Sequence, residues 1–119
     1  MALEVLNGPV IEAGESLSEG IDLSGGKLVR VTMPAAWTSP NQLTFQISSD
    51  GEFYNDLVDN AGNPVEWRVT PGSAVVVEAS LAVLAAAKFV KLRAGTPKNP
   101  VPQDERREFA VAIETPDAA

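Results

Sequence analysis

The stretch Gln42-Leu43-Thr44-Phe45-Gln46-Ile47-Ser48 alternates strictly between polar and apolar side chains. Successive side chains of a β-strand point to opposite faces, so Leu43, Phe45 and Ile47 are expected on one face and the polar residues on the other. One apolar and one polar face is typical of a strand in an antiparallel sheet that packs on a core and is solvated outside. This stretch therefore predicts a half-buried strand and indicates the fold class of the chain.

The same alternation recurs in other segments. In 27–33 it places Val29, Val31 and Met33 on the buried face. Residues 65–70 and 108–114 repeat it, with inward side chains expected at Val65, Trp67, Val69, Phe109, Val111 and Ile113. Two more strands are expected, one at 73–78, which contains a run of valines, and one at 89–94. A weaker strand is expected at 8–13.

Clusters of Gly, Pro, Asn and Asp separate these runs, and Asp50-Gly51 is a hairpin signal. About 7–8 short strands with such spacing predict an all-β fold, an antiparallel β-sandwich or jelly roll. Residues 79–87 are rich in strong helix formers and predict one short helix. We expect residues 1–24 to form an N-terminal arm or edge segment, 25–114 the sandwich domain, and 115–119 a C-terminal tail.

The composition argues against several classes of function. The chain has no cysteine and no histidine, so thiolate chemistry and the usual general base near neutral pH are missing. The net charge of −7 repels phosphate backbones and anionic membranes, so we expect neither nucleic acid nor membrane as a partner. No basic leader and no apolar run long enough to span a bilayer is visible. We predict a non-enzymatic protein without catalytic residues, metal or cofactor, synthesised in the cytoplasm.

Three features of the sequence are candidates for a site of chemistry. Gly25-Gly26-Lys27 departs from a phosphate-binding loop, because Ile21 stands where the first glycine belongs and Leu28 where a hydroxyl residue belongs. The acids at positions 50, 52, 56 and 59 do not have the ligand spacing of a calcium loop, which favours a solvated loop. A carboxylate pair for glycoside hydrolysis is defined by its separation in space, and no pair among the sixteen acids is singled out by the sequence.

Aromatic residues near polar loops suggest a binding surface instead. An exposed aromatic ring can stack on a sugar while nearby carboxylates hold its hydroxyl groups. The candidate ligand or partner surface comprises Trp37, Asp50, Tyr54 and Asp56. The alternative, which we favour for Trp37, is that this ring closes one end of the sandwich, because large aromatics are mostly buried.

Two segments carry a resemblance to known families. Residues 48–57 read Ser-Ser-Asp-Gly-Glu-Phe-Tyr-Asn-Asp-Leu, which resembles the S-x-D-G-x-x-[WY]-x-x-L hairpin of discoidin-type, galactose-binding-like jelly rolls. Residues 89–95 resemble a late strand of the same domains. The wider chain is similar to small β-sandwich proteins encoded among the structural genes of tailed bacteriophages, on segments 25–38, 43–51 and 89–96.

This resemblance implies a virion protein. Related sandwiches serve as capsid decoration (cement) proteins or as tail and baseplate modules. The expected function is binding and stabilising the major capsid protein shell, as a homo-oligomer for which a trimer is favoured. The alternative is a carbohydrate-binding module of a tail fibre or baseplate that contacts glycans of the host surface.

Overall fold

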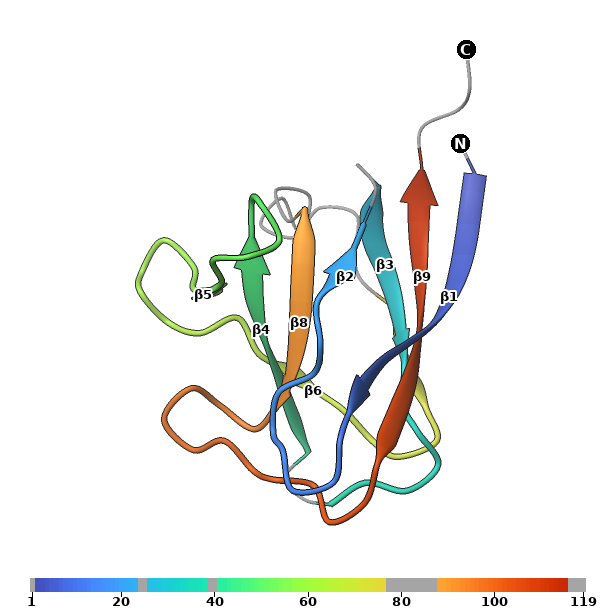
Figure 1. Ribbon diagram of the computed structural model, residues 1–119, viewed down its shortest axis with the longest axis vertical. Coiled ribbons are helices and arrows are strands. Elements are labelled where there is room, and N and C mark those ends of the chain that lie inside the picture. Colours follow the sequence, from blue (N-terminus) through green and yellow to red (C-terminus); the bar gives the residue numbers. More distant parts are fainter. Residues whose placement is uncertain (1, 24–25, 39–40, 77–87, 116–119) are drawn as a thin grey trace.

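The computed structural model describes residues 2–23, 26–38, 41–76 and 88–115, which form a β-sandwich (Figure 1). Every strand pairing in this part of the chain is antiparallel. One sheet has the order β1-β9-β3-β7, from strands Ala2–Ile11, Arg107–Thr115, Lys27–Thr32 and Ala74–Val76. The other has the order β2-β8-β4-β5 with β6 beside β4, from strands Ile21–Asp22, Phe89–Ala94, Gln42–Ser48, Asn55–Asp56 and Trp67–Arg68.

The core lies between the two sheets and is built from the alternating residues. Leu43 and Phe45 of β4 are buried, and Ile47 packs against the same cluster, as the alternation predicts. Burying a side chain of this size contributes about 1.5–3 kcal/mol. The remaining inward residues from both sheets are Ile11, Leu23, Leu28, Val31, Met33, Leu57, Val69, Val90, Leu92, Ala94, Phe109, Val111 and Ile113.

The prediction is wrong for one residue of the core. Val29 was expected inside, but it is half-buried, and Leu28 is 2% exposed instead. The register between β3 and β9 shifts between Leu28 and Arg30, which is a β-bulge. A bulge adds one residue to a strand and therefore reverses the alternation, so Leu28 points inward before it and Val31 after it.

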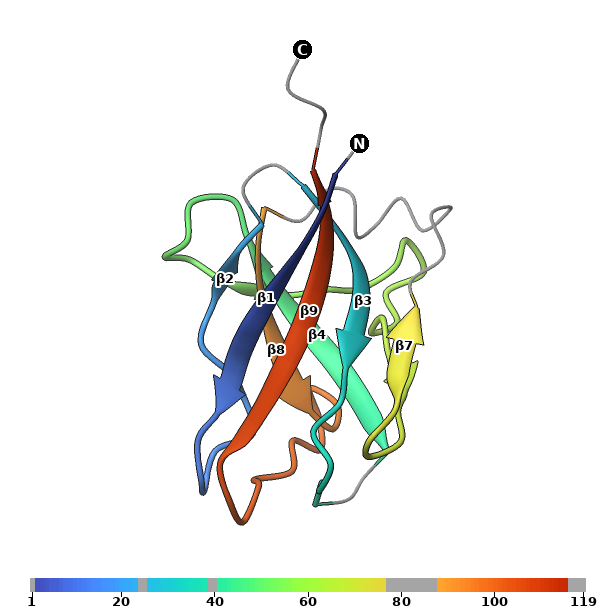
Figure 2. The ribbon, with the colours of Figure 1, turned by 90° about the vertical axis from the view of Figure 1, so that its right-hand side faces the viewer.

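Within the segment 1–24, expected as an arm or edge segment, residues 2–11 form an edge strand. β1 pairs with β9 from Ala2, opposite Thr115, to Ile11, opposite Arg107. Its register shifts between Asn7 and Val10, around a Gly-Pro pair that breaks the polar–apolar alternation. This interruption explains why the alternation indicates only a weak strand here. Figure 2 shows β1 and β2 along the same side of the sandwich.

Two other predicted strands are described in part. The segment 65–70 forms a strand only at β6. The strand expected at 73–78 is represented by β7, and its residues 77–78 lie outside the described ranges. No helix occurs in the described ranges, and the helix predicted at 79–87 lies outside them. The hairpin signal is confirmed, because β4 and β5 pair antiparallel on either side of Gly51, whose φ is +81°.

Candidate functional site

The turn after β4 is fixed by the carboxylate of Asp50. Its Oδ1 accepts hydrogen bonds from the backbone N–H groups of Glu52 at 2.9 Å and Phe53 at 3.0 Å. The hydroxyl of Ser48 donates to the same oxygen at 2.9 Å and accepts the N–H of Gly51. These donors, led by the N–H groups of Phe53 and Glu52, lower the pKa of Asp50 to about 2. The turn therefore holds a fixed anionic group at the surface.

A shallow hollow of about 250 Å³ opens beside this turn. Asp50 and Asp56 both line it, so the structure brings together two of the four predicted site residues. Phe53 lines it as well, and its side chain is 72% exposed. The other lining residues are Ile47, Ser48, Ser49 and Asn55. An exposed ring next to carboxylates and an amide is the combination that binds a sugar through both its apolar face and its hydroxyl groups.

Asp56 is anchored from the sheet below it. The Nη2 of Arg93 on β8 donates to Asp56 Oδ1, and the side-chain amide of Gln46 on β4 donates to the same oxygen at 3.2 Å. The hydrogen bond from Arg93 and, less strongly, that from Gln46 lower the pKa of Asp56, against partial burial that raises it. The side chain of Arg93 is only 9% exposed, while that of Asp56 is 41% exposed. Asp56 therefore presents a held carboxylate to solvent.

Tyr54 is not among the residues that line the hollow, and its ring lies against Lys91 of β8. The ammonium of Lys91 stands 4.4 Å from the centre of its ring, a cation–π contact. The position of Gly20 is also close, because a Cβ there would lie 2.9 Å from Cζ of Tyr54. Burial, followed by the charges of Asp50 and Asp22, raises the pKa of Tyr54. Tyr54 thus secures the segment before β2 against the sheet.

Trp37 lies far from these residues. It is half-buried, packs against the core and meets Phe109 edge to face, with 5.6 Å between ring centres. Its segment 33–38 leaves β3 at the opposite end of the sandwich from the turn after β4 (Figure 1). The neighbouring Thr38 is tied down by buried Gln103, whose Oε1 accepts the Thr38 N–H at 2.9 Å. Trp37 therefore packs at the end of the sandwich where β3 ends, and it is not part of the hollow.

Phe53 and Asn55 line the hollow and had not been predicted as site residues. Phe53 is a large apolar side chain between acids in a turn, and single exposed apolar side chains are common on protein surfaces. Only its aromatic ring beside acids was a signal in the sequence. The supporting Arg93 gave none, because its proximity to Asp56 depends on the pairing of β5 with β4 and of β4 with β8.

Two of the acids considered for calcium, Asp50 and Asp59, accept hydrogen bonds from the backbone of their own turns. Asp59 Oδ1 accepts the backbone N–H groups of Ala61 at 2.9 Å and Asn63 at 3.0 Å. Among the residues with described positions, no group of three or more acids is arranged to hold a metal ion. The same residues contain no helix of the length and apolarity needed to cross a membrane.

The chain was compared with known proteins by two searches. Neither the scan against protein-family models nor the search of curated proteins finds a match.

Proposed function

We propose that this chain is a structural protein of a tailed-phage virion, a capsid decoration protein that binds and stabilises the shell of major capsid protein. The resemblance of segments 25–38, 43–51 and 89–96 to small phage structural proteins motivates the proposal. The observation that carries it is a pair of exposed apolar side chains on an edge strand, Leu3 at 70% and Val5 at 58% exposure.

Leu3 and Val5 share the outer face of the first sheet. Val5 stands opposite Ala112 of β9, which in turn stands opposite Arg30 of β3. Residues directly opposite in an antiparallel pair lie on one face, so Val5 extends an outer row that includes the buried Ala112. Adjacent exposed apolar side chains at a sheet edge mark a surface that a protein partner can cover.

The charge of the chain defines the expected partner surface. A net charge of −7 favours docking on a basic protein surface and speeds the encounter with it. The proposed assembly on the shell is a homo-oligomer, with a trimer as the expected form. Sedimentation of the purified protein measures this directly, and a monomer at all concentrations would contradict the oligomer.

Particles assembled with and without the chain test the function. We expect the chain to cosediment with shells and to raise their temperature of disruption. The double variant Leu3→Glu, Val5→Glu should lose binding, whereas Phe53→Ala removes an equally exposed apolar side chain at another place and should bind normally. Shells of unchanged stability, or binding that is insensitive to the double variant, would refute the proposal.

The hollow beside Asp50 favours a second candidate, a carbohydrate-binding module. Three features support it: the 72% exposed ring of Phe53, the carboxylates of Asp50 and Asp56 held by hydrogen bonds, and Asn55, which lines the same hollow. A carboxylate fixed before binding loses less conformational entropy when it accepts a sugar hydroxyl.

Glycan-array binding with reciprocal controls separates the two candidates. Under the second candidate, Phe53→Ala and Asp56→Asn abolish glycan binding, and the Leu3→Glu, Val5→Glu variant retains it. Absence of binding to any glycan on the array, while the protein still binds shells, would exclude the sugar-binding candidate.

A further inference from the structure

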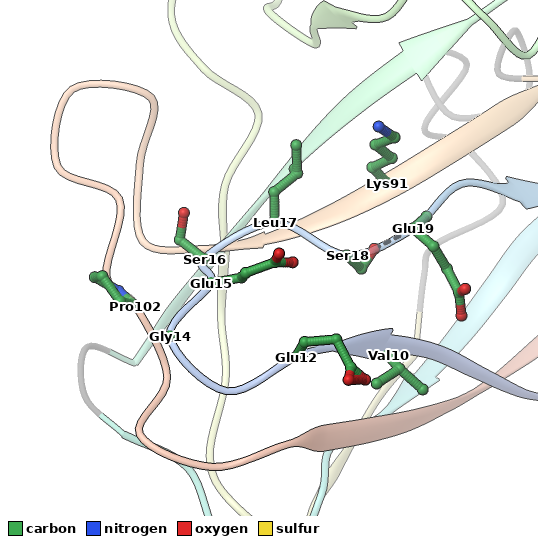
Figure 3. Close-up of a pocket in the computed structure, with 10 residues that line it drawn as sticks. All are labelled: Val10, Glu12, Gly14, Glu15, Ser16, Leu17, Ser18, Glu19, Lys91 and Pro102. Carbon is green, nitrogen blue, oxygen red and sulfur yellow. Dashed lines mark hydrogen bonds between the residues drawn. The ribbon is translucent and has the colours of Figure 1, made fainter.

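A long groove runs along the side of the sandwich where both sheets end. It consists of two adjoining hollows of about 590 Å³ and 180 Å³, which share Glu19 as a lining residue. The smaller hollow lies against residues 6–9 of β1 and the larger against Val10 and Glu12, so the two follow each other along the chain. The segment 14–21 forms the opposite wall of both. Figure 3 shows the larger hollow between β1 and this segment.

One wall of the groove is an open sheet edge. The N–H of Ser18 donates to the carbonyl of Leu92 at 2.8 Å, and the N–H of Ala94 donates to the carbonyl of Ser16 at 2.7 Å. Leu17, between them, forms an isolated antiparallel bridge with Arg93. In such a pair the flanking residues make the hydrogen bonds, so the N–H and C=O of Leu17 point to the other side, into the groove. An extended chain can pair with such an edge as an added strand.

The facing wall is shaped against self-pairing. β1 is also a terminal strand, but its register is broken between Asn7 and Val10, and Pro9 has no N–H to donate. A bulge and a proline are two of the devices that stop an edge strand from adding a further strand. The groove therefore has one wall where the N–H and C=O of Leu17 can pair with a partner chain, and a facing wall at β1 that is unsuited to strand pairing around Pro9.

The side chains around the groove select the charge of the occupant. The carboxylates of Glu12, Glu15 and Glu19 are distributed around the larger hollow (Figure 3), and all three residues are exposed. They are not grouped closely enough to hold one metal ion, within the residues that the structure describes. Glu12 already forms an exposed ion pair with Arg106, with 3.3 Å between Oε1 and Nε, so a partner cation has to compete with Arg106 there. Glu15 and Glu19 are separated anionic groups that match cations spaced along a chain. The cation that lines the hollow, Lys91, is already engaged with the ring of Tyr54.

The groove also offers apolar surface. Val10, Leu17 and Pro102 line the larger hollow together with the acids. Side chains alternate along an extended strand, so a peptide that pairs with the edge turns every second residue to one side. A sequence that alternates basic and apolar residues satisfies the carboxylates and the apolar lining at once.

We propose that this groove binds an extended segment of a partner protein that alternates lysine or arginine with apolar residues, by adding it as a strand to the edge at Leu17. The inference goes beyond the proposed function, and its test uses the isolated protein. The two proposals can therefore fail independently: the protein can bind the peptide without binding shells, and it can bind shells through Leu3 and Val5 without binding the peptide.

The experiment measures fluorescence polarisation of a short labelled peptide alternating lysine and valine. We expect saturable binding that weakens with added salt, and a peptide alternating glutamate and valine should not bind. Combined Glu12→Gln, Glu15→Gln and Glu19→Gln should weaken binding about tenfold, since each exposed ion pair contributes modestly. The matched control combines Glu52→Gln, Glu66→Gln and Glu105→Gln, which removes three exposed acids outside the groove and should leave binding unchanged.

Backbone methylation of the peptide separates strand addition from charge attraction. A peptide N-methylated at alternate residues on the pairing side cannot donate to the carbonyl of Leu17 and should lose binding, whereas methylation at the other alternate residues should not weaken it. Equal binding of all methylated peptides, equal affinity of the two glutamine triple variants, or no saturable binding of the cationic peptide would overturn the proposal.

Discussion

The substitution Gly95→Ala tests how the loop after β8 is attached to the sheet. Gly95 has a φ of +93°, which side chains of L-residues rarely adopt. A Cβ at this position would overlap the carbonyl oxygen of Asn99 and lie 3.1 Å from the N of Val101. Both atoms belong to the backbone of the same loop, so the loop must move to make room. The carbonyl of Gly95 accepts the buried Thr44 hydroxyl at 2.7 Å, and its N–H donates to the carbonyl of Gln42.

Two costs add up in this variant. A residue with a Cβ at such a φ costs about 1–2 kcal/mol. Moving the loop disturbs the hydrogen bond from Thr44, which is 1% exposed, and an unsatisfied buried hydroxyl costs about 1–3 kcal/mol. We therefore expect Gly95→Ala to lower the free energy of unfolding by about 3 kcal/mol. Gly62→Ala is the matched control, because Gly62 has a φ of +85° and nothing within 4 Å of the added Cβ, so it should cost only about 1 kcal/mol.

Urea unfolding followed by tryptophan fluorescence measures both variants. The difference of about 2 kcal/mol between them isolates the contact with the loop from the cost of the backbone angle. Equal destabilisation of the two variants would refute the reasoning, because it would mean that the loop accommodates a methyl group without disturbing Thr44.

Three further predictions concern the hollow and its surroundings. Asp56→Asn should lower the free energy of unfolding by about 1–2 kcal/mol at neutral pH, less than for a fully buried pair because the Asp56 side chain is 41% exposed, and urea unfolding measures it. Because folding lowers the pKa of Asp56, its contribution is complete above the ordinary value of 3.8 and should disappear as the pH falls through the lower folded value, while the variant shows no such loss. Asp50 should titrate near pH 2 in carboxyl-detected NMR, and a midpoint near 3.8 would contradict the turn geometry. Gly20→Ala should displace Tyr54 from its place and return its phenol pKa toward the ordinary value of 10.0, measured by ultraviolet titration, whereas an unchanged titration would contradict the contact.

The predictable part of the fold rests on uninterrupted alternation. β4 alternates strictly, and β8 and β9 nearly so, and their inward residues are those predicted, because a period of two leaves only one face for the core. The bulge in β3 exchanges Val29 for Leu28, and both are apolar, so the pattern of the segment fits either phase. No local signal in the sequence shows whether Val29 or Leu28 points into the core.

β1 was harder to predict for a different reason. Its exposed Leu3 and Val5 and its central Gly8-Pro9 do not form one buried face. The position of β1 is determined by its pairing with the long strand β9, whose residues 110–115 pair with residues 2–7. Pairing over such a distance in sequence is decided by the whole sandwich and not by the segment itself.

The candidate site also has a part that could be predicted from the sequence and a part that could not. Asp50 and Asp56 belong to one hairpin, so a local motif was enough to bring them together. Trp37 was grouped with them by residue type alone, and its edge-to-face contact with Phe109 places it at the other end of the sandwich. The groove along β1 had no local motif, because its two walls come from the ends of different sheets.

The pairing of Ala2 with Thr115 has a mechanical consequence. The hydrogen bonds between β1 and β9 run perpendicular to the two strands, and the adjacent ends of those strands lie at one end of the molecule (Figure 1). A tension that draws these two ends apart loads the bonds one after another, starting at the tip, so the ladder should open at low force. A tension between Ala2 and the far end of β9 loads all of them together as shear. The force needed to unfold the sandwich should therefore depend on the two residues between which the tension is applied.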